Sequence, residues 1–414
     1  MRILRTIAFP FMLTVCCLLT ACGGSVKKEN NMQVFEKGSF GYDLNYLSEY
    51  DSLIVLKGAN GNAQIIVSAK YQGKVFTSTA TGLSGKSLGF VNYKVFEAGV
   101  IDEHMNGYGG ENRFWLGPEG GQYAVFFKPG AEQIFDNWHT PKPIDIEAWD
   151  IVSSNEKSAV LEKEMQVDNY LGTSLRLNVV RKISLLEGDA ACKLLGITNN
   201  PRLNMVAYST DNAIFNLNDF EWTPQTGTVC IWILDMFNSA PRSVTIIPFN
   251  EGDESELGKI VTSDYFGEIP ADRLKIQGNV IYFKTDGNYR SKLGLNEKRA
   301  KPVAGTYDPD AKQLTITTFD VDKEAIYLNQ EWNTTKDPLV GDAMNSYNDG
   351  PLEDGSIIGP FLEIESASPA AFLKPGESLN HVHNVFHFVG EEADLNQIAE
   401  QLLGVSLQEV VVVF

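Results

Sequence analysis

Residues 173–186 read TSLRLNVVRKISLL, and this stretch decides the fold class. Leu175, Leu177 and Val179 alternate with the polar residues Arg176 and Asn178, which is the period-two pattern of a strand with one buried face. A helix would instead repeat its apolar residues three and four positions apart. The stretch therefore predicts a long β-strand in a sheet that packs on a core.

Similar short runs recur along the chain and are separated by turn signals such as Asp286-Gly287-Asn288. We expect strands at residues 64–68, 88–96, 123–127, 158–166, 229–234, 242–248, 278–284 and 313–319. Helices are expected only near residues 42–50 and at residues 394–403, where an apolar stripe is stopped by Gly404.

No flexible linker interrupts the chain after about Asn31, and no repeat of about 20 to 50 residues is found. The pattern argues against a solenoid or a propeller. We predict an all-β fold: a single large antiparallel β-sandwich over residues 36–414 with a few short helices.

The composition fits an exported globular domain. The chain has 414 residues, of which 43% are hydrophobic, enough for a sizeable core. Its formal net charge of −19 at pH 7 makes nucleic acid and anionic lipid headgroups poor partners.

The first residues predict a lipoprotein signal peptide over residues 1–21. Arg2 and Arg5 precede an apolar run over residues 7–19 that is too short for a permanent membrane span, and the segment ends Leu-Thr-Ala before Cys22. We expect Cys22 to be lipidated and residues 22–35 to form a polar tether that holds the domain at a membrane, in the periplasm or at the cell surface. The alternative is an ordinary secretory signal in which Cys22 is incidental.

Cysteine usage leaves one question open. Cys16 and Cys17 leave with the signal, so only Cys192 and Cys230 could pair in an oxidising compartment. Both lie among apolar residues, so buried free thiols and a disulfide are equally compatible with the sequence.

Several motifs, taken in their order along the chain, resemble galactose mutarotase-like proteins. They are the stretch 361–369 (FLEIESASP) with the Pro-Gly-Glu turn at residues 375–377, the stretch 208–217 ending in Phe-Asn-Leu, the stretch 109–115 (GGENRFW) and residues 291–295 (SKLGL). The pattern is most similar to an uncharacterised, lipoprotein-rich branch of that superfamily. The resemblance implies a β-supersandwich whose concave sheet holds a sugar.

The resemblance also implies roles for individual residues. Anomer interconversion needs a base for the anomeric hydroxyl proton and an acid for the ring oxygen. Glu363 lies where the superfamily has its catalytic base, whereas Asn212 lies where it has an acid histidine. An amide cannot serve as that acid, so Asn212 is expected to hold a sugar hydroxyl, and no double-aspartate motif is found. The alternative for Glu363 is a surface carboxylate on an edge strand.

Two further groups are candidates for the site. His381, His383 and His387 alternate along one expected strand, so they share a face, where they could line a polar pocket or hold a metal; the sequence favours the polar wall, and no metal ligand is assigned. Arg113, Trp115 and Glu119 have the residue types of a sugar site, since an aromatic face packs on a pyranose and planar polar groups bind its hydroxyls. The alternative is a buried tryptophan with a structural arginine pair.

Other chemistry has no support in the sequence. The glycine-rich stretches lack the spacing of a dinucleotide loop, a phosphate loop or a serine elbow, and the acidic loop at residues 345–355 lacks EF-hand spacing. No cofactor is named.

We therefore expect a lipid-anchored, carbohydrate-recognising protein, with three alternatives for its action. In the first, it is an enzyme with Glu363 as general base and an acid drawn from Glu365 or the histidines. In the second, it is a binding protein without turnover. The third is a scaffold or interaction protein. The sugar-binding residues expected are Arg113, Trp115, Glu119, Asn212, Glu365, His381 and His383.

Overall fold

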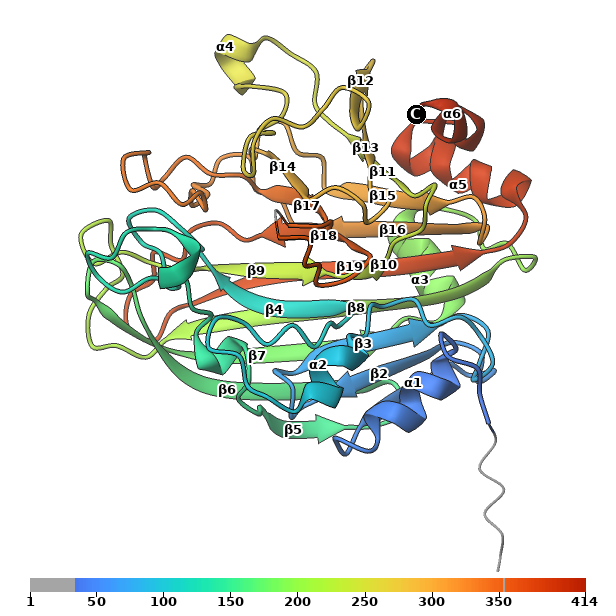
Figure 1. Cartoon of the computed structure of the whole chain (residues 1–414), viewed down its shortest axis with the longest axis horizontal. Coiled ribbons are helices and arrows are strands. Elements are labelled where there is room, and N and C mark those ends of the chain that lie inside the picture. Colours follow the sequence, from blue (N-terminus) through green and yellow to red (C-terminus); the bar gives the residue numbers. More distant parts are fainter. Residues whose placement is uncertain (1–33, 353) are drawn as a thin grey trace, which may run out of the picture. The chain divides into compact units, whose positions relative to one another are not determined.

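Two large antiparallel sheets form the domain, and Figure 1 shows their strands in a computed structural model of the chain. The structure describes residues 34–352 and 354–414, and residues 35–414 make one compact unit. The expected signal peptide, the lipidation site Cys22 and nearly all of the tether lie outside the described residues. The predicted all-β class, with a few short helices, is confirmed.

One sheet has nine strands in the order β1-β2-β3-β4-β9-β18-β17-β14, with β10 paired to β18. These strands are β1 (Ile54–Lys57), β2 (Gln64–Ser68), β3 (Lys74–Thr79), β4 (Asn112–Gly117), β9 (Cys230–Asp235), β10 (Phe237–Asn238), β14 (Ser291–Leu295), β17 (Met344–Asn348) and β18 (Phe361–Ala367).

The other sheet has ten strands in the order β12-β13-β11-β15-β16-β19-β8-β7-β6-β5. They are β5 (Asp150–Ser154), β6 (Ser158–Asp168), β7 (Ser174–Leu185), β8 (Asn204–Asn216), β11 (Val244–Pro248), β12 (Leu274–Gln277), β13 (Val280–Lys284), β15 (Val303–Asp308), β16 (Gln313–Phe319) and β19 (Ser378–Val389).

The stretch that decided the fold class is β7. Leu175, Leu177 and Val179 are fully buried, whereas Arg176 is exposed, as the period-two pattern predicts. Arg181 is also fully buried, although it is charged. Its guanidinium reaches the facing sheet, where it donates to the backbone oxygen of Gly73 and to Asn112. The core between the sheets is therefore apolar with a polar network built into it.

Short helices cover parts of the outer faces of both sheets. They are α1 (Phe40–Leu47), α2 (Tyr93–Ala98), α3 (Gly188–Leu195), α4 (Glu254–Leu257), α5 (Glu392–Leu403) and α6 (Leu407–Val412), with 3₁₀ turns η1 (Phe135–Asn137) and η2 (Lys142–Ile144). The expected helix at residues 394–403 is α5, and Gly404 ends it in the left-handed conformation that glycine adopts without strain. Leu395 and Ile398 of α5 pack on the outer face of the ten-stranded sheet.

Two of the expected strands are wrong. Residues 88–92 form only isolated bridges and α2 follows from Tyr93, while residues 123–127 are a buried loop. Phe126 in that loop stacks on Trp138, so its apolar run reflects burial under the sheet and not pairing within it. No helix in the described part of the chain is long and apolar enough to cross a membrane.

The structure distinguishes a disulfide from free thiols for the two cysteines that it describes. Cys192 and Cys230 are free and buried. Burial raises the pKa of the Cys230 thiol to about 12, so this thiol is inert at ordinary pH.

Candidate functional site

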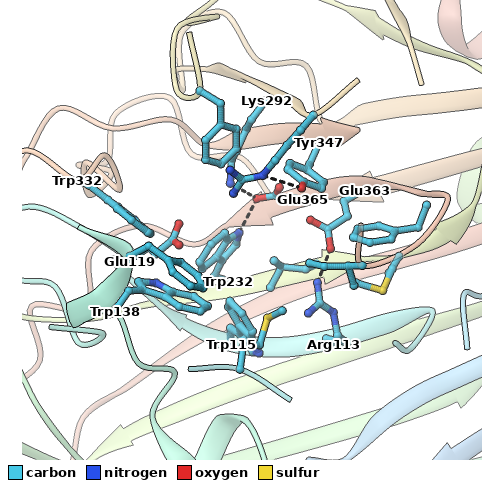
Figure 2. Close-up of a pocket in the computed structure, with 18 residues that line it drawn as sticks. Arg113, Trp115, Glu119, Trp138, Trp232, Lys292, Trp332, Tyr347, Glu363 and Glu365 are labelled. Atoms are coloured by element: carbon cyan, nitrogen blue, oxygen red, sulfur yellow. Dashed lines mark hydrogen bonds and ion pairs between the residues drawn. The ribbon is translucent and has the colours of Figure 1, made fainter. Parts of the chain in front are cut away.

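A pocket of about 140 Å³ lies on the outer face of the nine-stranded sheet (Figure 2). Strand alternation decides which side chains reach it. On β18, Glu363 and Glu365 face the pocket, whereas Ser366 between the sheets hydrogen-bonds His383 of β19. The pocket brings together five of the expected site residues: Arg113, Trp115, Glu119, Glu363 and Glu365.

The first ion pair of the pocket joins β4 to β18 across the intervening strand β9. Arg113 of β4 donates through Nη2 to Oε1 of Glu363, and both side chains are more than nine-tenths buried. The Arg113 guanidinium also lies 5.1 Å from the ring centre of Trp115. Arg113 Nε is buried and has no hydrogen-bond partner among the described residues. This pair therefore leaves one donor that a ligand could satisfy.

The second ion pair is more deeply buried. Oε2 of Glu365 accepts from Lys292 Nζ at 2.8 Å and from the Trp232 indole nitrogen at 2.9 Å. Oε1 of the same carboxyl group is buried without a partner in the described part of the structure. A buried polar atom left unpaired costs free energy, so an unpaired acceptor in a side chain that lines a pocket indicates a missing donor such as a ligand hydroxyl.

Aromatic side chains form one wall of the pocket. Figure 2 shows Trp138 and Trp332 near Glu119, on the side opposite the Arg113 and Glu363 pair, with Trp115 and Trp232 between the two sides. Trp115 and Trp232 meet edge to face at 5.6 Å between ring centres, and Trp138 and Trp332 lie nearly parallel at 6.1 Å. Such faces pack against the C–H face of a sugar ring.

Burial sets the proton affinities of the pocket. It raises the pKa of Glu363 to about 8, with the nearby Glu365 acting in the same direction and the Arg113 guanidinium opposing it. It also raises the pKa of Glu119, which Lys292 opposes. Burial would lower the pKa of Lys292, but the carboxylates of Glu365 and Glu119 outweigh it and raise that pKa. Glu363 can therefore exchange a proton near neutral pH.

The other expected sugar-binding residues lie between the sheets, away from this pocket. Asn212 of β8 is fully buried, accepts from Arg181 at 2.6 Å and donates to the backbone oxygen of His381. His381 and His383 are also fully buried, and both ring systems hydrogen-bond the Ser366 hydroxyl at 2.8 Å. The structure thus gives these three residues protein partners in the core, and the pocket is complete without them.

The three histidines of β19 share a face toward the nine-stranded sheet. His383 Nε2 lies 2.8 Å from Asp235 Oδ2, and His387 Nε2 lies 3.0 Å from Glu111 Oε1. Burial lowers the pKa of His381 to about 3, so its ring is neutral. Among the described residues no group of three or more histidine, cysteine or carboxylate side chains is placed to hold a metal ion.

The pocket contains residues that we did not single out as site residues from the sequence. They are Trp138, Trp232, Trp332, Arg290, Lys292 and Tyr347, together with apolar residues of the rim. The sequence held a signal for two of these residues. Arg290 and Lys292 are two positions apart, as Glu363 and Glu365 are, and this spacing places side chains on one face of an extended segment. Trp138 and Trp332 come from loops, whose approach to the sheet no period in the sequence shows.

The chain belongs to DUF6786, a family of unknown function. The sequence model of this family matches residues 38–414. No curated protein matches the chain.

Solved structures similar to this family member include proteins of the superfamily that its motifs resemble. A galactose mutarotase-like protein from Lactobacillus casei is 10% identical with a TM-score of 0.49 and covers 81% of this chain and 100% of its own. The galactose 1-epimerase from Lactobacillus acidophilus is 13% identical with a TM-score of 0.43, with coverage of 82% and 95%. Likeness at this level does not carry the activity of these proteins over to this chain.

Proposed function

We propose that this protein binds a saccharide in the pocket of the nine-stranded sheet and moves protons at its anomeric centre, with Glu363 as general base. The observation that carries the proposal is that two buried atoms, Arg113 Nε and Glu365 Oε1, have no hydrogen-bond partner among the described residues and belong to side chains of one pocket lined by four tryptophans. One donor and one acceptor without partners fit the hydroxyls of a sugar, each of which both donates and accepts. The tryptophan faces fit its apolar side.

The proton chemistry follows from the carboxyl groups. A general base is most effective when its pKa lies near the working pH, and burial moves Glu363 in that direction. Glu119 lies on the opposite side of the pocket (Figure 2), and its raised pKa favours the protonated form, so it is the candidate acid for the ring oxygen. The role that the resemblance gave to a histidine would thus pass to a carboxyl group.

A second candidate function is binding without turnover. One observation favours it: Arg113 donates a hydrogen bond to one oxygen of Glu363. An ion-paired carboxylate is a weaker base than a free one. In this alternative, Glu363 and Arg113 together bind sugar hydroxyls, and the pocket recognises a glycan that it does not change.

Two measurements on the full domain separate these functions. Calorimetric titration with D-galactose, D-glucose, D-mannose and their β-linked disaccharides tests binding, and quenching of tryptophan fluorescence reports on the pocket wall. Polarimetry of freshly dissolved α-anomers tests turnover. Binding with faster anomer equilibration supports the enzyme, binding without it supports the second candidate, and no binding by any sugar contradicts both.

We also propose that the domain is exported and anchored to a membrane through a lipid on Cys22. The ordered Leu-Thr-Ala-Cys at residues 19–22 after a basic and apolar segment supports this anchor. A surface with an overall negative charge would give the domain little membrane affinity of its own.

A further inference from the structure

The charges that line the pocket do not all pair with one another. Three cationic residues, Arg113, Arg290 and Lys292, face three carboxyl residues, Glu119, Glu363 and Glu365. Two ion pairs use Arg113 with Glu363 and Lys292 with Glu365. Arg290 forms no ion pair with any residue that the structure describes.

Arg290 is nevertheless held in place. Its Nε donates to the Tyr347 hydroxyl at 3.1 Å, and its guanidinium carbon lies 3.9 Å from the ring centre of Phe266. Tyr347 is fixed in turn, because its hydroxyl donates to Asp349 Oδ1 at 2.7 Å. The terminal nitrogens Nη1 and Nη2 have no hydrogen bond to a described residue. A positioned guanidinium with both terminal nitrogens free has the geometry that binds a carboxylate through two parallel hydrogen bonds.

The remaining carboxyl group does not pair with this guanidinium. Glu119 lies outside ion-pair distance of Arg290 in the part of the chain that the structure describes. Arg290 is therefore the lining cation without a carboxylate partner among the described residues, on a chain with a formal net charge of −19. An unpaired guanidinium in a pocket favours a ligand whose anionic group fits that one position.

We propose that the saccharide recognised by this pocket carries an anionic substituent, such as the carboxylate of a uronic acid, and that Arg290 binds this substituent. The inference rests on the proposed saccharide function and names its substrate class. Arg113 and Lys292 already form ion pairs with carboxylates of the protein, so their remaining donors contact sugar hydroxyls. Arg290 distinguishes charged sugars from neutral ones. Phe266 and Tyr347 position Arg290 and do not bind the anionic group themselves.

Matched sugars test the proposal by calorimetry. D-glucuronate is compared with D-glucose, D-galacturonate with D-galactose, and D-glucose 6-sulfate serves as a second anion. We expect the anionic member of at least one pair to bind about 10-fold or more tightly than its neutral parent, as a charged hydrogen-bonded pair allows. A preference for the sulfate alone would support the inference and identify a sulfate ester as the anion.

Variants assign the preference to Arg290. Arg290→Gln should reduce the ratio between the affinities for the anionic and the neutral sugar to about threefold or less, mainly by weakening binding of the anionic sugar. Arg290→Lys keeps the positive charge but lacks the paired terminal nitrogens of the guanidinium. This variant should retain part of the affinity ratio between the anionic and the neutral sugar. The control is Arg242→Gln, because Arg242 pairs with Asp310 and does not line the pocket.

Failure of this inference and failure of the proposed function give different results. Equal binding of neutral and anionic sugars by the wild type would overturn the role of Arg290 and leave the saccharide site standing. A preference that survives in Arg290→Gln would overturn the assignment to this residue. If neither neutral nor anionic sugars bind, that result contradicts both the proposed saccharide function and the role of Arg290. The wild-type ratio is informative even if the Arg290 variants do not fold.

Discussion

Lys292 of β14 and Glu365 of β18 form a buried ion pair across the intervening strand β17, with Nζ and Oε2 2.8 Å apart. The Trp232 indole of β9 donates to the same oxygen. Donors from β14 and β9 thus converge on one carboxylate oxygen of β18, and the other oxygen of that carboxyl group has no hydrogen-bond partner among the described residues. The ion pair between Lys292 and Glu365 therefore links the strands of the site and also fixes the orientation of the Glu365 carboxyl group.

Removing the cation of this pair should destabilise the domain strongly. Lys292→Met leaves the Glu365 carboxylate buried without its partner, and such a loss typically costs about 3 to 5 kcal/mol in free energy of unfolding. Urea unfolding followed by tryptophan fluorescence measures it. Lys312→Met is the control, because the Lys312 pair with Glu391 is exposed and such a pair contributes at most about 1 kcal/mol. Equal effects of the two substitutions would contradict the structural role of Lys292.

The fold class could be predicted from the sequence because burial in a sandwich imposes a period of two. β2 and β16 have the bounds that their patterns predicted, and β7 differs by one residue at each end. The errors have a common cause. Residues 123–127 are apolar because they pack under the sheet, and an apolar run alone does not distinguish a buried loop from a strand.

The candidate site could be predicted only in part. Glu363 and Glu365 lie two apart on one strand, so they were expected on one face, and Arg113 and Trp115 have the same spacing on β4. The sequence could not show which face of the sandwich each strand turns outward. That choice places Asn212 and the histidines of β19 between the sheets, where polar partners from the other sheet satisfy them.

Asp342 should make stability depend on pH. It is buried beside β17 and accepts from the Tyr265 hydroxyl at 2.6 Å. Burial raises its pKa to about 6, from an ordinary value of 3.8. Because the folded protein holds this proton more tightly than the unfolded chain, the stabilising contribution is fully present below about pH 4 and is lost as the pH rises through 6. The loss is about 3 kcal/mol, since one pKa unit corresponds to about 1.4 kcal/mol.

Asp342→Asn tests this dependence because an amide has no proton to lose and its oxygen can still accept from Tyr265. The free energy of unfolding of the variant, minus that of the wild type, should increase by about 3 kcal/mol between pH 4 and pH 7. Urea titrations at each pH unit measure the difference, in which groups common to both proteins cancel. Asp219→Asn, at an exposed position, should give a difference that is flat with pH. Parallel curves for Asp342→Asn and wild type would contradict the burial effect.

Cys22→Ser should release the domain from membranes or block its processing. The reason is that a serine cannot accept the lipid through a thioether, and the acidic domain has little membrane affinity without it. Fractionation of cells that express the full chain measures the outcome, with Cys192→Ser as a control for loss of a thiol elsewhere. A processed Cys22→Ser variant that fractionates with membranes as the wild type does would show that the anchor is not this cysteine.

Glu363→Gln distinguishes catalysis from binding at the proposed site. The amide keeps the shape of the carboxyl group and can still accept from Arg113, but it cannot take a proton. If Glu363 is a general base, anomer interconversion should fall by about 10² to 10⁴ with little change in sugar affinity, because this is the usual contribution of such a base. If the protein only binds, affinity should change by about 1 to 3 kcal/mol, and the wild type should show no turnover to lose. Glu377→Gln, at an exposed carboxylate outside the pocket, should change neither quantity. Turnover by the wild type that Glu363→Gln leaves intact would place the base elsewhere, and Glu119→Gln would then be the variant expected to lose it, since Glu119 is the other pocket carboxyl group whose pKa burial raises.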